Sequence, residues 1–225
     1  LYAWEGVNPV IPELWALPSG LPIHPSRFQS HTRVTYSAMA ALYGERFQVA
    51  LSPVIEELRS ELFPEGFANV DFAASRNQVR REDLYEVPGA VLKVGYELVR
   101  LVDKLQTERG RKKTLAAIRE DIRWELTTSN HASISALSGL LSTLALYSAD
   151  PDDVDVAKAV RQFEGWLWED DRSGTRVAGA RSAVWDTALA AQALAAVDSA
   201  GDEDRNALLL AGRFLGAQQI TETPA

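Results

Sequence analysis

Residues 132–149 read ASISALSGLLSTLALYSA, a stretch without a single charged side chain. A helix of this length could span a bilayer. Its serines, threonine and glycine, however, make it less apolar than a membrane-spanning helix, and a helix enclosed by other helices needs no charged face. We therefore predict that this stretch is a buried inner helix of a helical protein.

A second charge-poor stretch and a weak repeat extend this prediction. Residues 183–195 read AVWDTALAAQALA. DVDVAKAVRQFEG, from Asp153, matches DRNALLLAGRFLG, from Asp204, in its acidic start, its central apolar positions and its final Phe-x-Gly. Repeated helix pairs indicate either a solenoid or a closed barrel of hairpins, and charge-poor inner helices favour the barrel. The predicted fold class is all-α, built from α/α-barrel (toroid) helical-hairpin repeats.

The remaining chain also has helical periodicity. Two helices are predicted between about Arg27 and Pro64, a third from about Ala90 to Leu105, and a fourth from the basic run at 109–113 to about Trp124.

Residues 1–25 differ from the rest, because five prolines interleaved with two tryptophans exclude a long helix. We interpret this segment as an ordered, aromatic-rich connector. The chain begins without methionine or a signal-peptide pattern, so we expect it to be an internal piece of a larger protein.

Composition limits the function. The chain has 225 residues and is 46% hydrophobic, enough for one substantial core or two partial ones. A net charge of −8 and the lack of a basic stripe argue against a nucleic-acid partner. The absence of cysteine excludes disulfides, thiolate zinc sites and a cysteine nucleophile.

Two acidic segments resemble catalytic motifs but have simpler interpretations. DPDDVD at 150–155 could hold a strong general acid, since two aspartates that share a site raise one pKa. Asp150 before Pro151, however, is the pattern of a helix N-cap followed by proline at the first helical position, and we predict that capping role. EDDRSG at 169–174 is predicted to be a solvated turn that ends at a glycine.

The histidines do not predict a metal site. His24 and His31, in HPSRFQSHTRVTY, are seven residues apart, or about 10 Å along a helix axis, which is too far to share one metal. His131 is remote in sequence. Neither a nucleophile elbow nor a dinucleotide-binding glycine loop is present, so no cofactor is predicted. Local patterns alone favour a structural role for His31.

Longer patterns point to a family. Residues 2–47 contain, in order, W-E-G-x-N, P-E-x-W, L-P, H-P-S, H-x-R, a tyrosine and Y-G-x-R-F. Residues 58–85 contain L-R-x-E-L, R-N and E-D-L-Y, and residues 182–194 read SAVWDTALAAQAL. In order and spacing these blocks resemble oxidosqualene cyclases, the lanosterol and cycloartenol synthase-like members of the terpene cyclase/mutase family, over essentially the whole chain.

The resemblance implies a fold and an activity. It implies parts of two α/α barrels around a large apolar cavity: residues 1–160 would form the connector and later helices of one barrel, and residues 161–225 the opening helices of the catalytic barrel. The implied enzyme is an isomerase that cyclises 2,3-oxidosqualene to a sterol-type triterpene without a cofactor. Its carbocation intermediates need aromatic faces in a dry pocket and a base that only the last cation reaches.

The resemblance also implies site residues. His31 matches the family histidine beside the late cation, which accepts or relays the terminal proton. Trp185 matches a cavity-wall aromatic, although a structural core tryptophan is the alternative. Leu137 falls at an aliphatic cavity-lining position. Tyr36 matches a residue that lines the site and supports the histidine rather than reacting.

The chain departs from the family pattern in three places. Gln29, Ser30 and Thr32 replace the tryptophan and two cysteines that flank the histidine, so one aromatic wall is lost. SALS at 135–138 replaces a glycine–proline pair. The D-C-T-A-E motif that carries the protonating aspartate is absent, so this piece alone is not expected to cyclise anything.

Two alternatives stay open. One is a non-catalytic helical-hairpin scaffold or lipid-binding descendant that has lost the acid. The other is a squalene-hopene-type cyclase, which would carry a D-x-D-D motif downstream. The resemblance further implies a squalene-derived lipid substrate and peripheral or monotopic membrane contact at the cytoplasmic face through the full-length protein.

Overall fold

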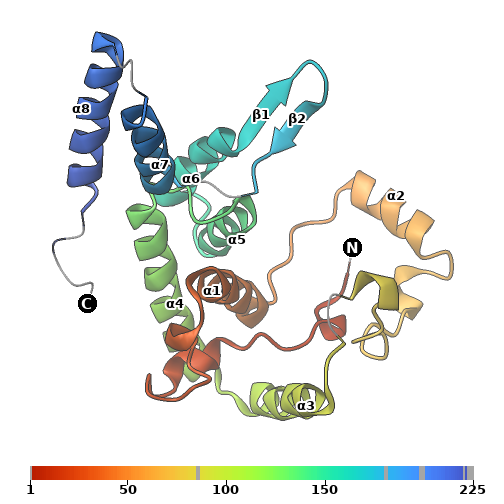
Figure 1. Ribbon diagram of the computed structural model, residues 1–225. Helices are drawn as coiled ribbons and strands as arrows, with labels where there is room; N and C mark the ends of the chain where they lie inside the picture. The colour runs from red at the N-terminus through yellow and green to blue at the C-terminus, as the bar shows by residue number, and fades with distance from the viewer. Residues whose placement is uncertain (1, 85–86, 180–181, 198–200, 220, 222–225) are drawn as a thin grey trace.

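The computed structural model describes residues 2–84, 87–179, 182–197, 201–219 and 221 (Figure 1). Within these residues the chain forms eight α-helices and one two-stranded sheet. The helices are α1 (Ser30–Glu45), α2 (Pro53–Leu62), α3 (Ala90–Leu105), α4 (Glu108–Thr128), α5 (Ala136–Tyr147), α6 (Val154–Phe163), α7 (Ala183–Ala195) and α8 (Asp202–Ala217). The predicted all-α fold class is confirmed, whereas the division at residue 160 stays a prediction.

Most predicted helices form where the periodicity placed them. The helices predicted at 90–105 and 183–195 have those bounds as α3 and α7. The helix predicted to end near Trp124 continues to Thr128. From residue 2 onward, the helical elements of the proline-rich connector are short 3-10 turns, at Trp4–Gly6, Pro12–Ala16 and Pro25–Arg27.

The core lies where α1, α4 and α5 meet. One face of α1 is made of small buried residues, with Ser37, Ala38 and Ala41 fully enclosed. Ile118 and Leu126 of α4 are likewise fully buried. Because small side chains let helix axes approach closely, α1 packs directly on α5 and α4. This packing brings the start of α1 to the start of α5.

The two charge-poor helices differ in burial. Helix α5 is buried on one face only, through Ala136, Ser138, Ser142, Ala145 and Leu146. Helix α7 contains no buried residue, because its main neighbour is α8 alone and one helix cannot enclose another. The prediction of a buried inner helix is therefore correct for one face of α5 and wrong for α7 within the described residues.

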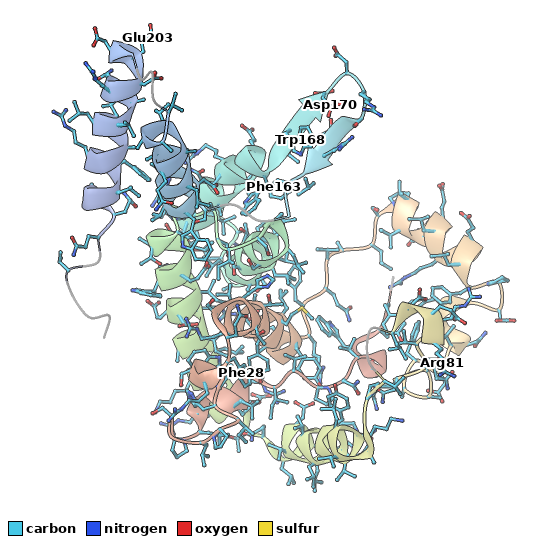
Figure 2. The ribbon with its side chains drawn as sticks, in the orientation of Figure 1. Phe28, Arg81, Phe163, Trp168, Asp170 and Glu203 are labelled. Atoms are coloured by element: carbon cyan, nitrogen blue, oxygen red, sulfur yellow. The ribbon has the colours of Figure 1, made fainter. Side chains whose placement is uncertain are left out.

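The acidic turn at 169–174 lies in a β-hairpin that the sequence pattern did not predict. β1 (Leu167–Asp170) pairs antiparallel with β2 (Gly174–Val177). The Asp170 carboxylate accepts from the backbone amides of the turn, and Gly174 has a left-handed φ of 65°. Figure 2 shows Trp168 and Asp170 on this hairpin, which projects from the body.

The predicted cap of α6 is also corrected. The N-cap is Asp153, whose Oδ1 accepts from the amide of Asp155 at 2.8 Å, and the helix begins at Val154. Asp150 instead accepts from the amide of Asp152 at 3.0 Å, which closes a turn before the helix. Two aspartates compete for the cap here, and the nearer one forms it.

Candidate functional site

His31 lies in the first turn of α1 and contacts the first turn of α5. Gln29 caps α1, because its side chain accepts from the amide of Thr32 at 3.2 Å. His31 Nε2 lies 3.0 Å from Ser135 Oγ, across 104 residues of sequence. The close packing of α1 on α5 therefore holds one imidazole nitrogen at the N-cap of α5.

Three serines continue from this contact, and we call Ser133, Ser135 and Ser138 the serine cluster. Ser135 and Ser138 form a reciprocal capping box, with each amide donating to the other's hydroxyl at 3.0–3.1 Å. Ser138 Oγ lies 3.1 Å from Ser135 Oγ and 2.9 Å from Ser133 Oγ. Ser133 Oγ in turn donates to Glu125 Oε1 on α4 at 2.9 Å. An unbroken series of contacts thus runs from His31 to Glu125.

Glu125 is the electrostatically unusual member. Its pKa is raised from 4.5 to about 7, chiefly by burial and to a smaller extent by the charge of the nearby Asp121. The Ser133 hydrogen bond and the charge of Arg33 oppose this rise. Burial also raises the pKa of Asp121, which accepts from Ser37 at 3.4 Å. The carboxyl of Glu125 is therefore placed to exchange a proton near neutral pH.

Tyr36 supports α1 from the side of the connector. Its hydroxyl donates to the backbone oxygen of Ile11 at 2.5 Å, and its ring lies edge-to-face with Phe28 at 5.6 Å between centroids. Burial, and then the charge of Glu13, raise the pKa of Tyr36. Burial thus keeps the hydroxyl neutral and the hydrogen bond to Ile11 fixes its position, while a substrate contact for Tyr36 stays a prediction.

Leu137 and Trp185 lie on different helices. Leu137 follows Ser135 by two residues in the first turn of α5, and 60% of it is exposed. Trp185 belongs to α7 and is 74% exposed. The structure thus brings His31 and Leu137 to one end of α5, whereas Trp185 stands on the helix pair α7–α8. Cavity-lining roles for Leu137 and Trp185 stay predictions.

The other two histidines have separate surroundings. His24 is buried against Trp15, and its Nδ1 accepts from the amide of Ser26 at 3.1 Å. His131 Nε2 lies 3.0 Å from Asp155 Oδ1. Within the described ranges, no cluster of three or more histidine, aspartate or glutamate side chains could hold a metal ion.

Sequence reasoning missed the serine cluster and Glu125. The available signal was S-x-x-S at 135–138, whose spacing permits a reciprocal cap of the helix that follows. Glu125 lies between apolar neighbours near the end of a long helix. A glutamate at such a position is rarely buried, so its burial could not be expected from the sequence.

Comparison with known proteins defines the family. Residues 1–172 match the model of the squalene-hopene cyclase N-terminal domain. The lanosterol synthase of Homo sapiens is 31% identical over 100% of this chain and 31% of that protein. The lanosterol synthase of Pneumocystis carinii is 31% identical over 97% of this chain and 31% of that protein. The cycloartenol synthase of Dictyostelium discoideum is 25% identical over 98% of this chain and 31% of that protein.

The chain therefore belongs to the squalene-hopene cyclase family, and its resemblance to lanosterol and cycloartenol synthases is confirmed. It spans about a third of the length of these relatives.

Proposed function

We propose that this chain is part of an enzyme that cyclises 2,3-oxidosqualene to a sterol-type triterpene through carbocation intermediates. The observation that carries the proposal is the packing of His31 against the start of α5, in a chain whose relatives are lanosterol and cycloartenol synthases and whose H-x-R pattern resembles the one around the family histidine. The hydrogen bond between His31 Nε2 and Ser135 Oγ supports it, since a base must be held in one orientation to meet a transient cation.

In this proposal His31 takes the last proton from the cyclised cation. Trp185 contributes an aromatic wall to the cavity, where its π face stabilises positive charge. Leu137 contributes an aliphatic surface that keeps the pocket dry. Tyr36 lies behind the site and holds α1 against the connector.

Product analysis of the full-length protein with 2,3-oxidosqualene tests this role. His31→Ala should change the product profile or release partly cyclised products. His31→Gln keeps a polar group near Ser135 but cannot take a proton, so it should show the same defect if the chemistry depends on basicity. Unaltered products and rate in both folded variants would refute the role.

A squalene-hopene-type activity is the second candidate, because the matching family model carries that name. The two enzymes differ in the acid that starts the reaction and in the substrate it protonates. Cyclisation of squalene by the full-length protein, with a D-x-D-D motif downstream, would favour this candidate. A downstream D-C-T-A-E motif and activity on the epoxide alone would favour the first.

We also propose peripheral contact with the cytoplasmic face of a membrane. The described helices include none that is both long and apolar enough to cross a bilayer. Helix α3, however, exposes Val91, Leu98 and Leu105 by 88%, 61% and 73%, on one helical face. In the full-length protein, Val91→Glu and Leu98→Glu should weaken binding to liposomes in a flotation assay. Lys93→Glu, on the polar face of α3, should leave that binding unchanged. Fractionation of cells should show whether the protein lies with the membranes that face the cytoplasm.

A further inference from the structure

The contacts between His31 and Glu125 form a continuous chain of hydrogen bonds whose donors can be oriented in one direction. The amides of Ser138 and Ser135 donate to Ser135 Oγ and Ser138 Oγ, so each hydroxyl already accepts one bond. The Ser138 hydroxyl can donate its proton either to the backbone oxygen of Ser135 at 3.1 Å or to Ser133 Oγ at 2.9 Å, and a relay needs the second arrangement. With His31 Nε2–H as the first donor, every hydroxyl proton can point the same way, towards Glu125 Oε1. Each step spans 2.9–3.1 Å between heavy atoms, which is hydrogen-bond distance.

Glu125 is suited to end this chain. Its Oε1 accepts from Ser133, while its buried Oε2 has no hydrogen-bond partner among the described residues. The charged groups that face it are Asp121 on α4, which disfavours its ionised form, and Arg33 on α1, which favours that form. A buried carboxylate with an unpaired oxygen is stabilised when it gains a proton.

The loop that carries Ser133 is held in an uncommon conformation. Asn130, His131 and Ser133 have φ values of 53°, 60° and 59°, in the left-handed region that non-glycine residues rarely enter. Such a conformation persists only where its surroundings enforce it. Here it places the Ser133 hydroxyl between Ser138 and Glu125.

We propose that the serine cluster passes the proton that His31 takes from the last cation to Glu125, the final acceptor within the protein. This proposal rests on the proposed function of His31. Residues 135–138 are also where the chain departs from the glycine–proline pair of the enzymes it resembles, and neither glycine nor proline supplies a hydroxyl. The relay is therefore a property of this chain rather than of the family pattern.

The proton transfer balances in one concerted step. A C–H bond next to the cationic carbon breaks, and its electron pair forms the product's C=C bond. Nδ1 of His31 takes that proton, while Nε2–H passes its own proton to Ser135 Oγ. The hydroxyl protons of Ser135, Ser138 and Ser133 each move one place on, and the last binds Glu125. His31 ends neutral in its other tautomer, and Glu125 ends protonated.

Histidine NMR of the full-length protein tests the connection without any need for turnover. With 13Cε1-labelled histidine, the signal of His31 should show, in addition to the step of an imidazole itself, a second and smaller step near pH 7 as Glu125 titrates. Glu125→Gln should abolish that step, and Ser138→Ala should abolish it while Glu125 is still present. The step should persist in Asp121→Asn, which distinguishes Glu125 from its acidic neighbour.

Ser142→Ala is the matched control for Ser138→Ala. Ser142 is a fully buried serine of α5 whose hydroxyl has no partner among the described residues, so its removal should leave the step unchanged. The signals of His24 and His131 report whether each variant is folded. A His31 curve that is the same in the wild type and in Glu125→Gln would overturn the proposal.

Turnover of 2,3-oxidosqualene by the full-length protein then tests whether catalysis uses the relay. Glu125→Gln should slow product formation by about 100-fold or more, the size expected for a lost proton acceptor. The wild-type rate should fall below about pH 7, where Glu125 is protonated, and this limb should be missing from the variant. Equal rates and pH profiles would exclude the relay from catalysis. A protein with no cyclase activity would instead contradict the proposed function, and the NMR titration would still decide whether the connection exists.

Discussion

Helices α5 and α7 are similar in composition but differ in how far they are buried. Both are poor in charge and rich in alanine and leucine. Helix α5 packs against α1, α4 and α6, and Ser138, Ala145 and Leu146 are buried there. Helix α7 packs chiefly on α8 (Figure 1). Trp185 and Leu189 of α7 remain exposed. An apolar pattern thus selects the helix, but the number of neighbouring helices decides its burial.

The two regions also differ in how their charges are paired. In the first turn of α4, Arg111 bridges Glu13 of the connector at 2.8 Å and Asp103 of α3 at 2.6 Å, and all three side chains are at most 20% exposed. On α8, Arg205 lies 3.5 Å from Asp202 with both side chains largely in solvent. Loss of a buried cation leaves two carboxylates without compensation, whereas loss of an exposed one costs little.

The largest expected effect is therefore that of Arg111→Met. It should lower the free energy of unfolding by about 3–5 kcal/mol, because Glu13 is buried and loses its counter-charge. Urea denaturation measures the change. Arg205→Met on α8 is the matched control and should leave the midpoint unchanged. Similar losses in both variants would mean that the two regions are stabilised alike.

Deletion of apolar side chains gives the next contrast. Ile118→Ala in the core should cost about 2–5 kcal/mol through lost burial and a residual cavity. The side chain of Leu209 on α8 is 61% exposed, so Leu209→Ala should change the free energy of unfolding by less than about 0.5 kcal/mol. A cost for Leu209→Ala as large as that for Ile118→Ala would show that α8 is packed as tightly as α4.

Local sequence signals explain which parts of the fold were predictable. The bounds of α3 and α7 follow from apolar periodicity next to Gly89 and Ser182, which occupy their N-cap positions. The hairpin was missed because β1 and β2 are short and almost wholly exposed, so no apolar alternation marks them. The cap of α6 was misplaced because several aspartates fit that position equally well in sequence.

The candidate site was predictable only in part, for a different reason. His31 was found because a family pattern surrounds it. Its partner Ser135 is 104 residues away, and only the packing of α1 on α5 brings the two together. The raised pKa of Glu125 depends on burial by several helices, which no short stretch of sequence encodes.

The pH dependence of stability sharpens the comparison further. The pKa of Glu125 is about 7 in the folded chain and 4.5 without the fold's influence, so the folded state binds this proton more tightly. The free energy of unfolding should therefore fall by roughly 2–3 kcal/mol as pH rises from about 4.5 to about 7. Glu125→Gln should remove that part of the slope.

Denaturation at several pH values checks this result as a difference between variant and wild type, because Asp121 titrates in the same direction. Glu203→Gln, at the exposed start of α8, should leave the slope as it is. A slope in Glu125→Gln equal to that of the wild type would show that Glu125 is ionised as freely as a surface carboxylate.

The smallest expected effect distinguishes two serines on the same face of α5. Ser142 is fully buried and its hydroxyl has no partner among the described residues, so Ser142→Ala removes a desolvation cost and should raise stability by up to about 1 kcal/mol. Ser138→Ala should instead cost about 1–3 kcal/mol, because the amide of Ser135 loses its acceptor. Thr187→Ala on α7, half-exposed, should change stability by less than about 0.5 kcal/mol. The melting temperature should therefore rise in Ser142→Ala, fall in Ser138→Ala and stay unchanged in Thr187→Ala. Equal shifts in Ser142→Ala and Ser138→Ala would mean that the serine cluster contributes nothing specific to the stability of the α5 region.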